Sequence, residues 1–119
     1  MTISYARLQE YLSLIGPRAG NAPHGEFWDV DRNIFIGMNI PGVGCNGAAI
    51  PAVDAANPAA SGFLEILKAG LCENPQMPRF AKKVTSASYN VTLSDGSVVT
   101  GAQMLQDIED WLVAGCPEK

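Results

Sequence analysis

The side chains with the most distinctive chemistry in this sequence are three cysteines and a single histidine. The cysteines are Cys45, Cys72 and Cys116, and no two of them form a Cys-x-x-Cys pair. Zinc sites need clustered cysteine and histidine ligands, and with His24 as the only histidine these spacings fit no zinc pattern. Two alternatives remain for the cysteines: three buried thiols, as in a cytoplasmic protein, or one disulfide with one free thiol.

If a disulfide forms, we expect it to join Cys72 to Cys116 and to leave Cys45 free. Each of the paired residues follows the predicted end of a helix, at Gly70 and at Gly115. Backbones can approach one another at such positions to the Cα separation of about 5.5–6 Å that a disulfide needs. This pairing would brace the segment between the two helices.

Other patterns that could bind a ligand are incomplete. Residues 42–47 fit Gly-x-Gly-x-x-Gly, but the strand and helix of a dinucleotide site are not predicted around them. Residues 29–33 resemble the start of a calcium loop, but Ile34 stands where that loop needs glycine and Ile40 where it needs glutamate. His24 could act as a general base, although a loop histidine bonded to the backbone is the simpler interpretation. We therefore expect no bound metal and no cofactor.

Length and charge exclude several classes of protein. The chain has 119 residues, which fits one domain spanning 1–119, and 47% of them are apolar, enough to form a core. The net charge is −4 and no basic stripe exists, which argues against nucleic-acid binding. The apolar runs are far shorter than the ~20 residues that span a bilayer, so we expect no membrane partner. Without a signal-peptide pattern the chain is expected to be cytoplasmic, or periplasmic or extracellular if Met1 is not its natural start.

Apolar spacing predicts mainly helices that must position these side chains. Helices are expected over 3–15, 61–70 and 101–114, the last with a capping box in which Gln103 reaches back to Thr100. A helix near 28–38 is favoured over a strand there. Alternating residues over 89–99 predict one β-hairpin, whereas 39–60 and 72–83 are expected to be irregular loops.

The C-terminal half resembles the second half of a bacterial cytochrome c domain. The likeness rests on residues 61–70 (SGFLEILKAG), 76–78 (Gln-Met-Pro) and 108–118 (IEDWLVAGCPE). The resemblance implies a mainly α, cytochrome c-like helical domain with one small β-hairpin and long loops. It also implies that the first and last helices pack together, and that Met77 occupies the position of the family's haem-iron ligand.

The motif that binds haem in that family is incomplete here. Cytochromes c attach haem through Cys-x-x-Cys-His. Residues 42–46 (Gly-Val-Gly-Cys-Asn) keep only the second cysteine, Cys45, and Asn46 stands where the ligating histidine would be. Asparagine is not a usual axial ligand of haem iron. We therefore expect a cytochrome c-like fold without its cofactor, in which Met77 fills space in the core.

Two functions follow from a haem fold without haem. The first is an accessory or interaction module that docks on a partner enzyme or oxidoreductase, through the 39–60 segment or the region near Met77. The alternative is a small-ligand-binding protein or an enzyme that re-uses the vacated pocket, with His24, Asn46 and Met77 as its candidate residues. No complete catalytic set can be placed, so whether the chain is an enzyme stays open and a non-enzymatic role with a protein partner is favoured.

Overall fold

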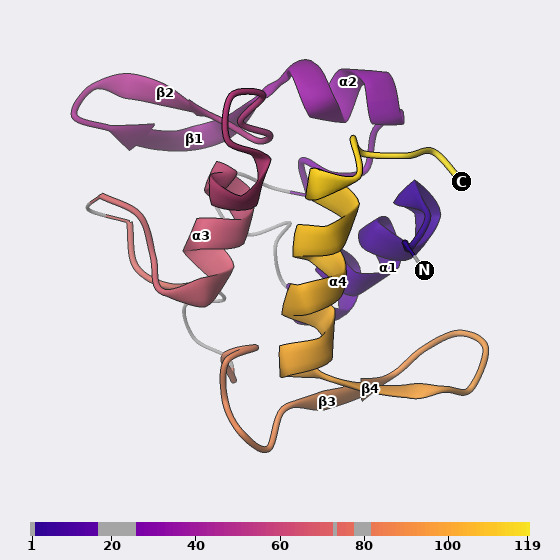
Figure 1. The fold of residues 1–119 in the computed structure, drawn as a ribbon. Helices are drawn as coiled ribbons and strands as arrows, with labels where there is room; N and C mark the ends of the chain where they lie inside the picture. The colour runs from indigo at the N-terminus through magenta and orange to yellow at the C-terminus, as the bar shows by residue number, and fades with distance from the viewer. Residues whose placement is uncertain (1, 17–25, 73, 78–81) are drawn as a thin grey trace.

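The computed structural model describes residues 2–16, 26–72, 74–77 and 82–119. Within them the chain forms four α-helices, a short 3-10 helix and two antiparallel two-stranded hairpins (Figure 1). In chain order the elements are α1 (Tyr5–Ile15), α2 (Arg32–Gly37), β1 (Asn39–Cys45), β2 (Ala48–Pro51), η2 (Pro58–Ala60), α3 (Gly62–Lys68), β3 (Asn90–Thr92), β4 (Val98–Thr100) and α4 (Gly101–Val113). The domain is therefore α/β: the expected helices and the expected small hairpin are present, and a second small hairpin, which was not predicted, accompanies them.

The first and last helices begin at capped residues, as their sequences predict. Ser4 accepts a hydrogen bond from the Arg7 amide at 3.1 Å, and Thr100 accepts one from the Gln103 amide at 3.2 Å. Such caps satisfy amide groups that have no partner inside a helix. The second half of the predicted capping box is wrong, because the Gln103 side chain donates to Asp107, 2.7 Å away.

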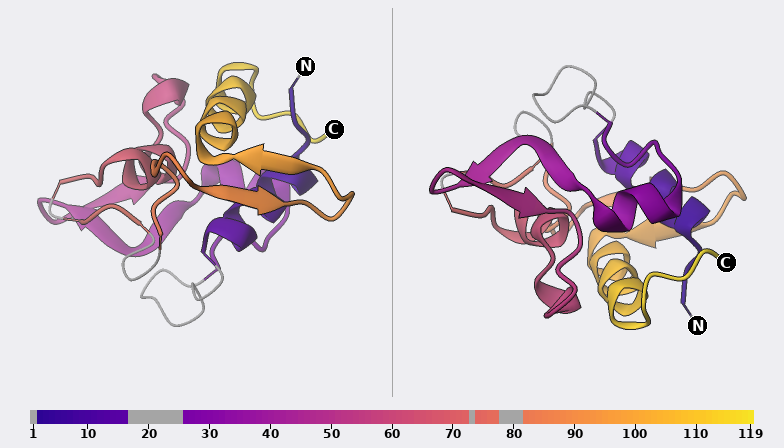
Figure 2. Two further views of the ribbon diagram at one scale, coloured as in Figure 1. Left: turned by 90° about the horizontal axis from the view of Figure 1, so that it is seen from below. Right: turned by 90° about the horizontal axis from the view of Figure 1, so that it is seen from above.

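The helices α1 and α4 pack together, which confirms the expected pairing (Figures 1 and 2). The ring of Tyr5 stacks on that of Trp111 with centroids 6.0 Å apart, and the Tyr11 hydroxyl donates to Asp107 at 2.6 Å. The Tyr5 amide also donates to the Glu118 carbonyl at 3.1 Å. Apolar packing and hydrogen bonds thus join the two ends of the described chain.

An aromatic cluster with one ring from each helix fills the centre of the domain. Phe35 of α2 is fully buried, and its ring centroid lies 5.7 Å from Tyr5, 5.4 Å from Phe63 and 6.2 Å from Trp111. Tilted and edge-to-face arrangements of this kind are favourable for aromatic pairs. The four helices therefore share one core.

The helix α2 is shorter than the predicted helix near 28–38. It begins at Arg32, after Asp31, whose side chain makes no capping hydrogen bond. The first residue of α2 is bonded to α4: the Arg32 guanidinium donates to the carbonyls of Gly115 and Cys116, just beyond the end of that helix. A cation at this position also interacts favourably with the negative end of the helix dipole.

The 39–60 segment is not the irregular loop that its glycines and prolines predict. The strands β1 and β2 pair antiparallel around a turn at Asn46 and Gly47, with the pairs Gly44–Ala49 and Cys45–Ala48 beside it. Both turn residues have positive φ, 52° and 81°, as a two-residue type I′ turn requires. The domain therefore has a second hairpin.

The remaining predicted elements are close to their expected positions. The strands β3 and β4 form the hairpin predicted over 89–99, and α3 lies within the predicted 61–70. In the described ranges, no helix is long and apolar enough to cross a membrane.

Candidate functional site

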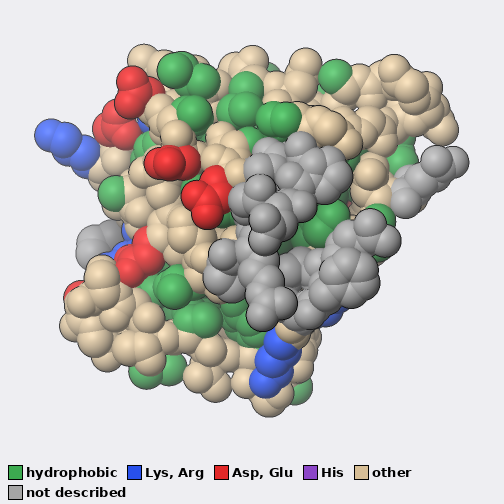
Figure 3. Space-filling model, turned by 180° about the vertical axis from the view of Figure 1, so that it is seen from behind, with side chains coloured by type: hydrophobic (Ala, Val, Ile, Leu, Met, Phe, Trp, Pro, Cys, Tyr) green, Lys and Arg blue, Asp and Glu red, His purple; other side chains and the backbone are tan. Residues whose placement is uncertain are grey.

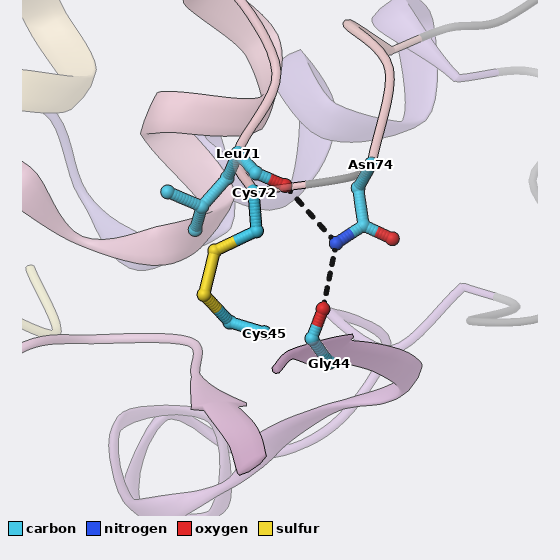
Figure 4. Close-up of a disulfide and its surroundings, with 5 residues drawn as sticks. All are labelled: Gly44, Cys45, Leu71, Cys72 and Asn74. Atoms are coloured by element: carbon cyan, nitrogen blue, oxygen red, sulfur yellow. Dashed lines mark hydrogen bonds between the residues drawn. A yellow bond between two sulfur atoms is a disulfide. The ribbon is translucent and has the colours of Figure 1, made fainter. Parts of the chain in front are cut away.

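A disulfide joins the tip of the β1–β2 hairpin to the segment that follows α3 (Figure 4). It links Cys45 to Cys72, whose Cα atoms are 5.5 Å apart, and it leaves Cys116 as a buried free cysteine. The predicted pairing of Cys72 with Cys116 is wrong. The physical reason is that the hairpin folds β1 back against the turn after α3, whereas Cys116 is buried in the core at the end of α4.

The position of Cys72 depends on a tight reversal of the chain after α3. Gly70 has φ of 93°, and a Cβ there would lie 2.6 Å from the Asn74 carbonyl oxygen, so only glycine fits this turn. Leu71 and Asn74 then bond to each other as an isolated antiparallel bridge. Cys72 lies inside this reversal with φ of 55°, a left-handed conformation that is uncommon for residues other than glycine.

A side-chain amide makes a second link at the same place. The Asn74 Nδ2 atom donates to the Leu71 carbonyl at 3.1 Å and to the Gly44 carbonyl at 2.9 Å (Figure 4). One amide group therefore holds both the reversal and the hairpin next to Cys45. The tip of the hairpin is fixed by one covalent bond and one hydrogen bond.

The hairpin presents an exposed surface without charge. No residue from 33 to 53 is charged. The exposed residues of β1, β2 and their turn include small or polar ones: Asn39, Pro41, Gly42, Gly44, Asn46, Gly47, Ala48, Ala49 and Pro51. Seen from behind, the corner of the molecule where the hairpin lies shows no acidic or basic side chain (Figure 3).

The underside of the hairpin packs against α3. Ile40 and Ile50 are 3% and 5% exposed, so both face the core. A Cβ at Gly62 would collide with the Ile50 side chain and with the Pro51 carbonyl. The absence of a side chain at Gly62 is therefore what lets α3 approach the base of the hairpin closely.

Two of the three residues proposed for a vacated pocket, Asn46 and Met77, lie within the described part of the chain. Asn46 is exposed in the hairpin turn, and Met77 is half-buried against the core, with its amide donating to the Ile66 carbonyl at 3.0 Å. His24 lies outside the described residues. Asn46 and Met77 thus have different environments. Neither of them lines the surface hollow at the start of α4 or the one beside α1.

Two shallow hollows lie elsewhere on the surface. One, of about 220 Å³, lies at the start of α4 beside the hydroxyl groups of Thr85, Ser86 and Thr100. The other, of about 480 Å³, is open to solvent between α1 and Ser94. Among the described residues, no three histidine, cysteine or acidic side chains are grouped closely enough to hold a metal ion.

The free cysteine is not an activated nucleophile. Burial raises the pKa of the Cys116 thiol, and the nearby Arg32 guanidinium only partly opposes this effect. A thiol with a raised pKa is protonated at neutral pH and reacts slowly. Thiol chemistry at the surface is therefore confined to the Cys45–Cys72 pair within the described chain.

The sequence analysis did not predict the β1–β2 hairpin, although the Asn46-Gly47 pair in its turn indicated one. Asn46-Gly47 is the dipeptide most typical of a two-residue hairpin turn. The described geometry combines two properties, a rigid neutral surface and an exposed cross-link that thiols could exchange.

Comparisons of this chain with protein families, with curated proteins and with solved structures gave no match.

Proposed function

We propose that this domain is a cofactor-free interaction module that docks on a partner enzyme or oxidoreductase through its β1–β2 hairpin. One observation carries the proposal: the hairpin is exposed, has no charged residue, and is fixed at its tip by the Cys45–Cys72 disulfide. The partner class rests on the resemblance of residues 61–70, 76–78 and 108–118 to cytochromes c.

A neutral surface favours burial in an interface. The cores of protein interfaces are depleted in charged residues, because an unpaired charge loses its hydration when it is buried. The hairpin can be covered without that cost. A two-residue turn and a disulfide also order it before binding, so that less conformational entropy is lost on association.

The packing of the interior supports a role without haem. The rings of Tyr5, Phe35, Phe63 and Trp111 pack on one another at the centre of the domain. Met77 packs against the same core. Side chains thus fill the centre of the described domain, which supports a core that contains no cofactor.

The disulfide supports a particular compartment. Disulfides persist mainly in secreted and periplasmic proteins, because cytoplasmic thiol systems keep cysteines reduced. We therefore favour a periplasmic or extracellular location over a cytoplasmic one. The alternative function, a ligand site built from His24, Asn46 and Met77, has less support because Asn46 is exposed at the hairpin tip.

The test is a charge placed on the proposed docking surface. Ala49 of β2 is exposed, so Ala49→Arg should leave the fold intact and put a cation into the interface. The matched control is Ala6→Arg, on the exposed side of α1. Each variant and the wild-type protein would be affinity-purified from extracts of the source cells, and the bound proteins compared by quantitative mass spectrometry.

The expected result is a specific protein that co-purifies with the wild-type chain and with Ala6→Arg, and is depleted with Ala49→Arg. Equal recovery with both variants would count against the hairpin as the docking surface. A Soret band in the visible spectrum of protein purified from haem-replete cells would count against a cofactor-free module.

A further inference from the structure

The three cysteines differ sharply in their access to solvent. Cys72 is exposed and Cys45 is half-buried, whereas Cys116 is only 5% exposed. A thiol reagent can therefore reach the disulfide, at Cys72, without any unfolding of the core. The buried Cys116 provides an internal reference, because it becomes reactive only when the domain opens.

The hairpin is held differently at its two ends. At its base, Ile40 and Ile50 are buried and the Ala52 amide donates to the Met38 carbonyl at 2.9 Å. At its tip, the Asn74–Gly44 hydrogen bond is the one noncovalent polar link to the segment after α3 within the described chain. Breaking the disulfide would therefore free the tip while the base stays packed.

We propose that the Cys45–Cys72 disulfide is a redox latch: a dithiol reductant opens it in the folded protein, frees the hairpin tip and so weakens docking at this surface. The regulatory part of this inference rests on the proposed function. The latch itself rests only on the exposure of Cys72 and on the way in which the hairpin is anchored.

The chemistry is a thiol–disulfide exchange. A thiolate of the dithiol attacks Sγ of Cys72, the more exposed of the two residues, so that a mixed disulfide forms and Cys45 leaves as a thiolate. The second thiol of the reductant then attacks its own sulfur in the mixed disulfide and releases Cys72. Two electrons pass from the dithiol to the cysteine pair, and the dithiol ends as a disulfide. A disulfide oxidant of the same class reverses the step.

The backbone at Cys72 favours release once the bond is broken. Its φ of 55° is held within the reversal from Gly70 to Asn74, and a residue with a Cβ leaves this region readily when nothing constrains it. Relaxation at Cys72 would move the carbonyl of Leu71 and its Asn74 partner. The hydrogen bond from Asn74 to Gly44 would then be lost together with the disulfide.

The first test counts accessible thiols in the whole folded protein. The chain would be treated with dithiothreitol without denaturant, pulsed with N-ethylmaleimide, and analysed by intact mass and peptide mapping. A latch gives two modified cysteines, Cys45 and Cys72, with Cys116 modified at least about tenfold more slowly. Three cysteines modified at one rate, or none, would overturn the proposal, because reduction would then require global unfolding or would not occur.

The second test locates the motion by hydrogen exchange before and after reduction. On reduction, exchange in residues 43–50 should increase by a factor at least about tenfold larger than any increase in α1 and α4, which speed up only as far as the whole domain is destabilised. The variant Cys45→Ser/Cys72→Ser should match the reduced protein and should not respond to dithiothreitol. Unchanged exchange in the hairpin after complete reduction would contradict the latch.

The third test separates regulation from docking. The protein that co-purifies with the wild-type chain should be recovered less with the Cys45→Ser/Cys72→Ser variant. Equal recovery with this variant, together with loss in Ala49→Arg, would overturn the regulatory role while docking at the hairpin stands. If Ala49→Arg has no effect, the docking surface is wrong, and the thiol count and exchange data still decide whether the latch exists.

Discussion

The half of the domain built on α1 and α4 and the half that carries the β1–β2 hairpin are stabilised in different ways. In the first half, Tyr5 and Trp111 stack, Tyr11 bonds to Asp107, and each helix begins at a capping side chain. In the second half, a short hairpin with few large side chains depends on a disulfide at its tip. Packing and hydrogen bonds hold the first half, whereas the second half combines a packed base with a covalent bond at its exposed tip.

This difference shows where the domain can change without unfolding. The α1–α4 half has large buried side chains, and losing any of them creates a cavity. The hairpin half has small exposed residues whose position is set at two points, its buried base and its cross-linked tip. A surface of the second kind can be released by one chemical step, which a packed core does not allow.

The substitution with the largest expected effect breaks the packed half. Trp111 is fully buried, contacts Tyr5 and Phe35, and donates from Nε1 to the Pro117 carbonyl at 2.9 Å. Trp111→Ala should lower the free energy of unfolding by about 3–5 kcal/mol, measured by urea denaturation. Val113→Ala, at an exposed site on the same helix, is the control and should change it by no more than about 0.5 kcal/mol.

The next effect tests the cross-linked half. The disulfide closes a loop with a sequence separation of 27, so in the chain-entropy model Cys45→Ser/Cys72→Ser should lose about 3–4 kcal/mol in the free energy of unfolding. Urea denaturation with and without reductant measures it. Wild-type protein in reductant should match the variant. A loss below about 1 kcal/mol would mean that the hairpin half does not depend on its cross-link.

A smaller effect tests the hydrogen bond between α1 and α4. The Tyr11 hydroxyl donates to the Asp107 carboxylate. Two effects raise the pKa of Tyr11: burial of the hydroxyl, which is the larger, and this hydrogen bond. Tyr11→Phe should lower the free energy of unfolding by about 1.5–3 kcal/mol, the usual contribution of a hydrogen bond to a charged group. Tyr89→Phe is the matched control, since the described residues give that hydroxyl no partner. Equal losses in the two variants would show that the bond to Asp107 adds nothing specific.

The smallest effect concerns the contact of α1, in the packed half, with the β3–β4 turn. Hydrogen bonds from the Ser97 hydroxyl and amide, then from Arg7, lower the pKa of the exposed Asp95 from 3.8 to about 2. Its stabilising contribution is therefore present above pH 3.8 and is lost as the pH falls toward 2. An NMR titration of the carboxyl group measures this, and Ser97→Ala should move the pKa back upward. A titration midpoint near 3.8 in the wild-type protein would contradict the contact.

The parts of the fold that follow local rules could be predicted from the sequence. The cap at Thr100, the apolar face of α4 and the turn after Leu93 are each specified by residues close together in the chain. These signals were sufficient for α1, α3, α4 and the β3–β4 hairpin. The packing of α1 on α4 followed from their apolar faces and from the resemblance to cytochromes c.

The candidate site could not be predicted in the same way. Strands β1 and β2 are rich in glycine, alanine and proline, which have low strand propensity, so their one strong local signal was the Asn46-Gly47 turn. The partner of Cys72 depends on which segments meet in space, and helix ends carry no information on that. Cys45 was interpreted as the remnant of a haem motif, whereas the fold uses it as a cross-link.

The hydrogen bond between the Tyr5 amide and the Glu118 carbonyl has a consequence for how the domain can be tethered. It brings the two ends of the described chain to the same side of the molecule, and the β1–β2 hairpin lies on the opposite side (Figures 1 and 2). Any polypeptide joined to either end therefore leaves the domain on the side away from the hairpin. When the domain is attached through one of these ends to a surface, a particle or a larger protein, its neutral hairpin would point away from the attachment. Linkers fused to both ends would also leave the hairpin accessible.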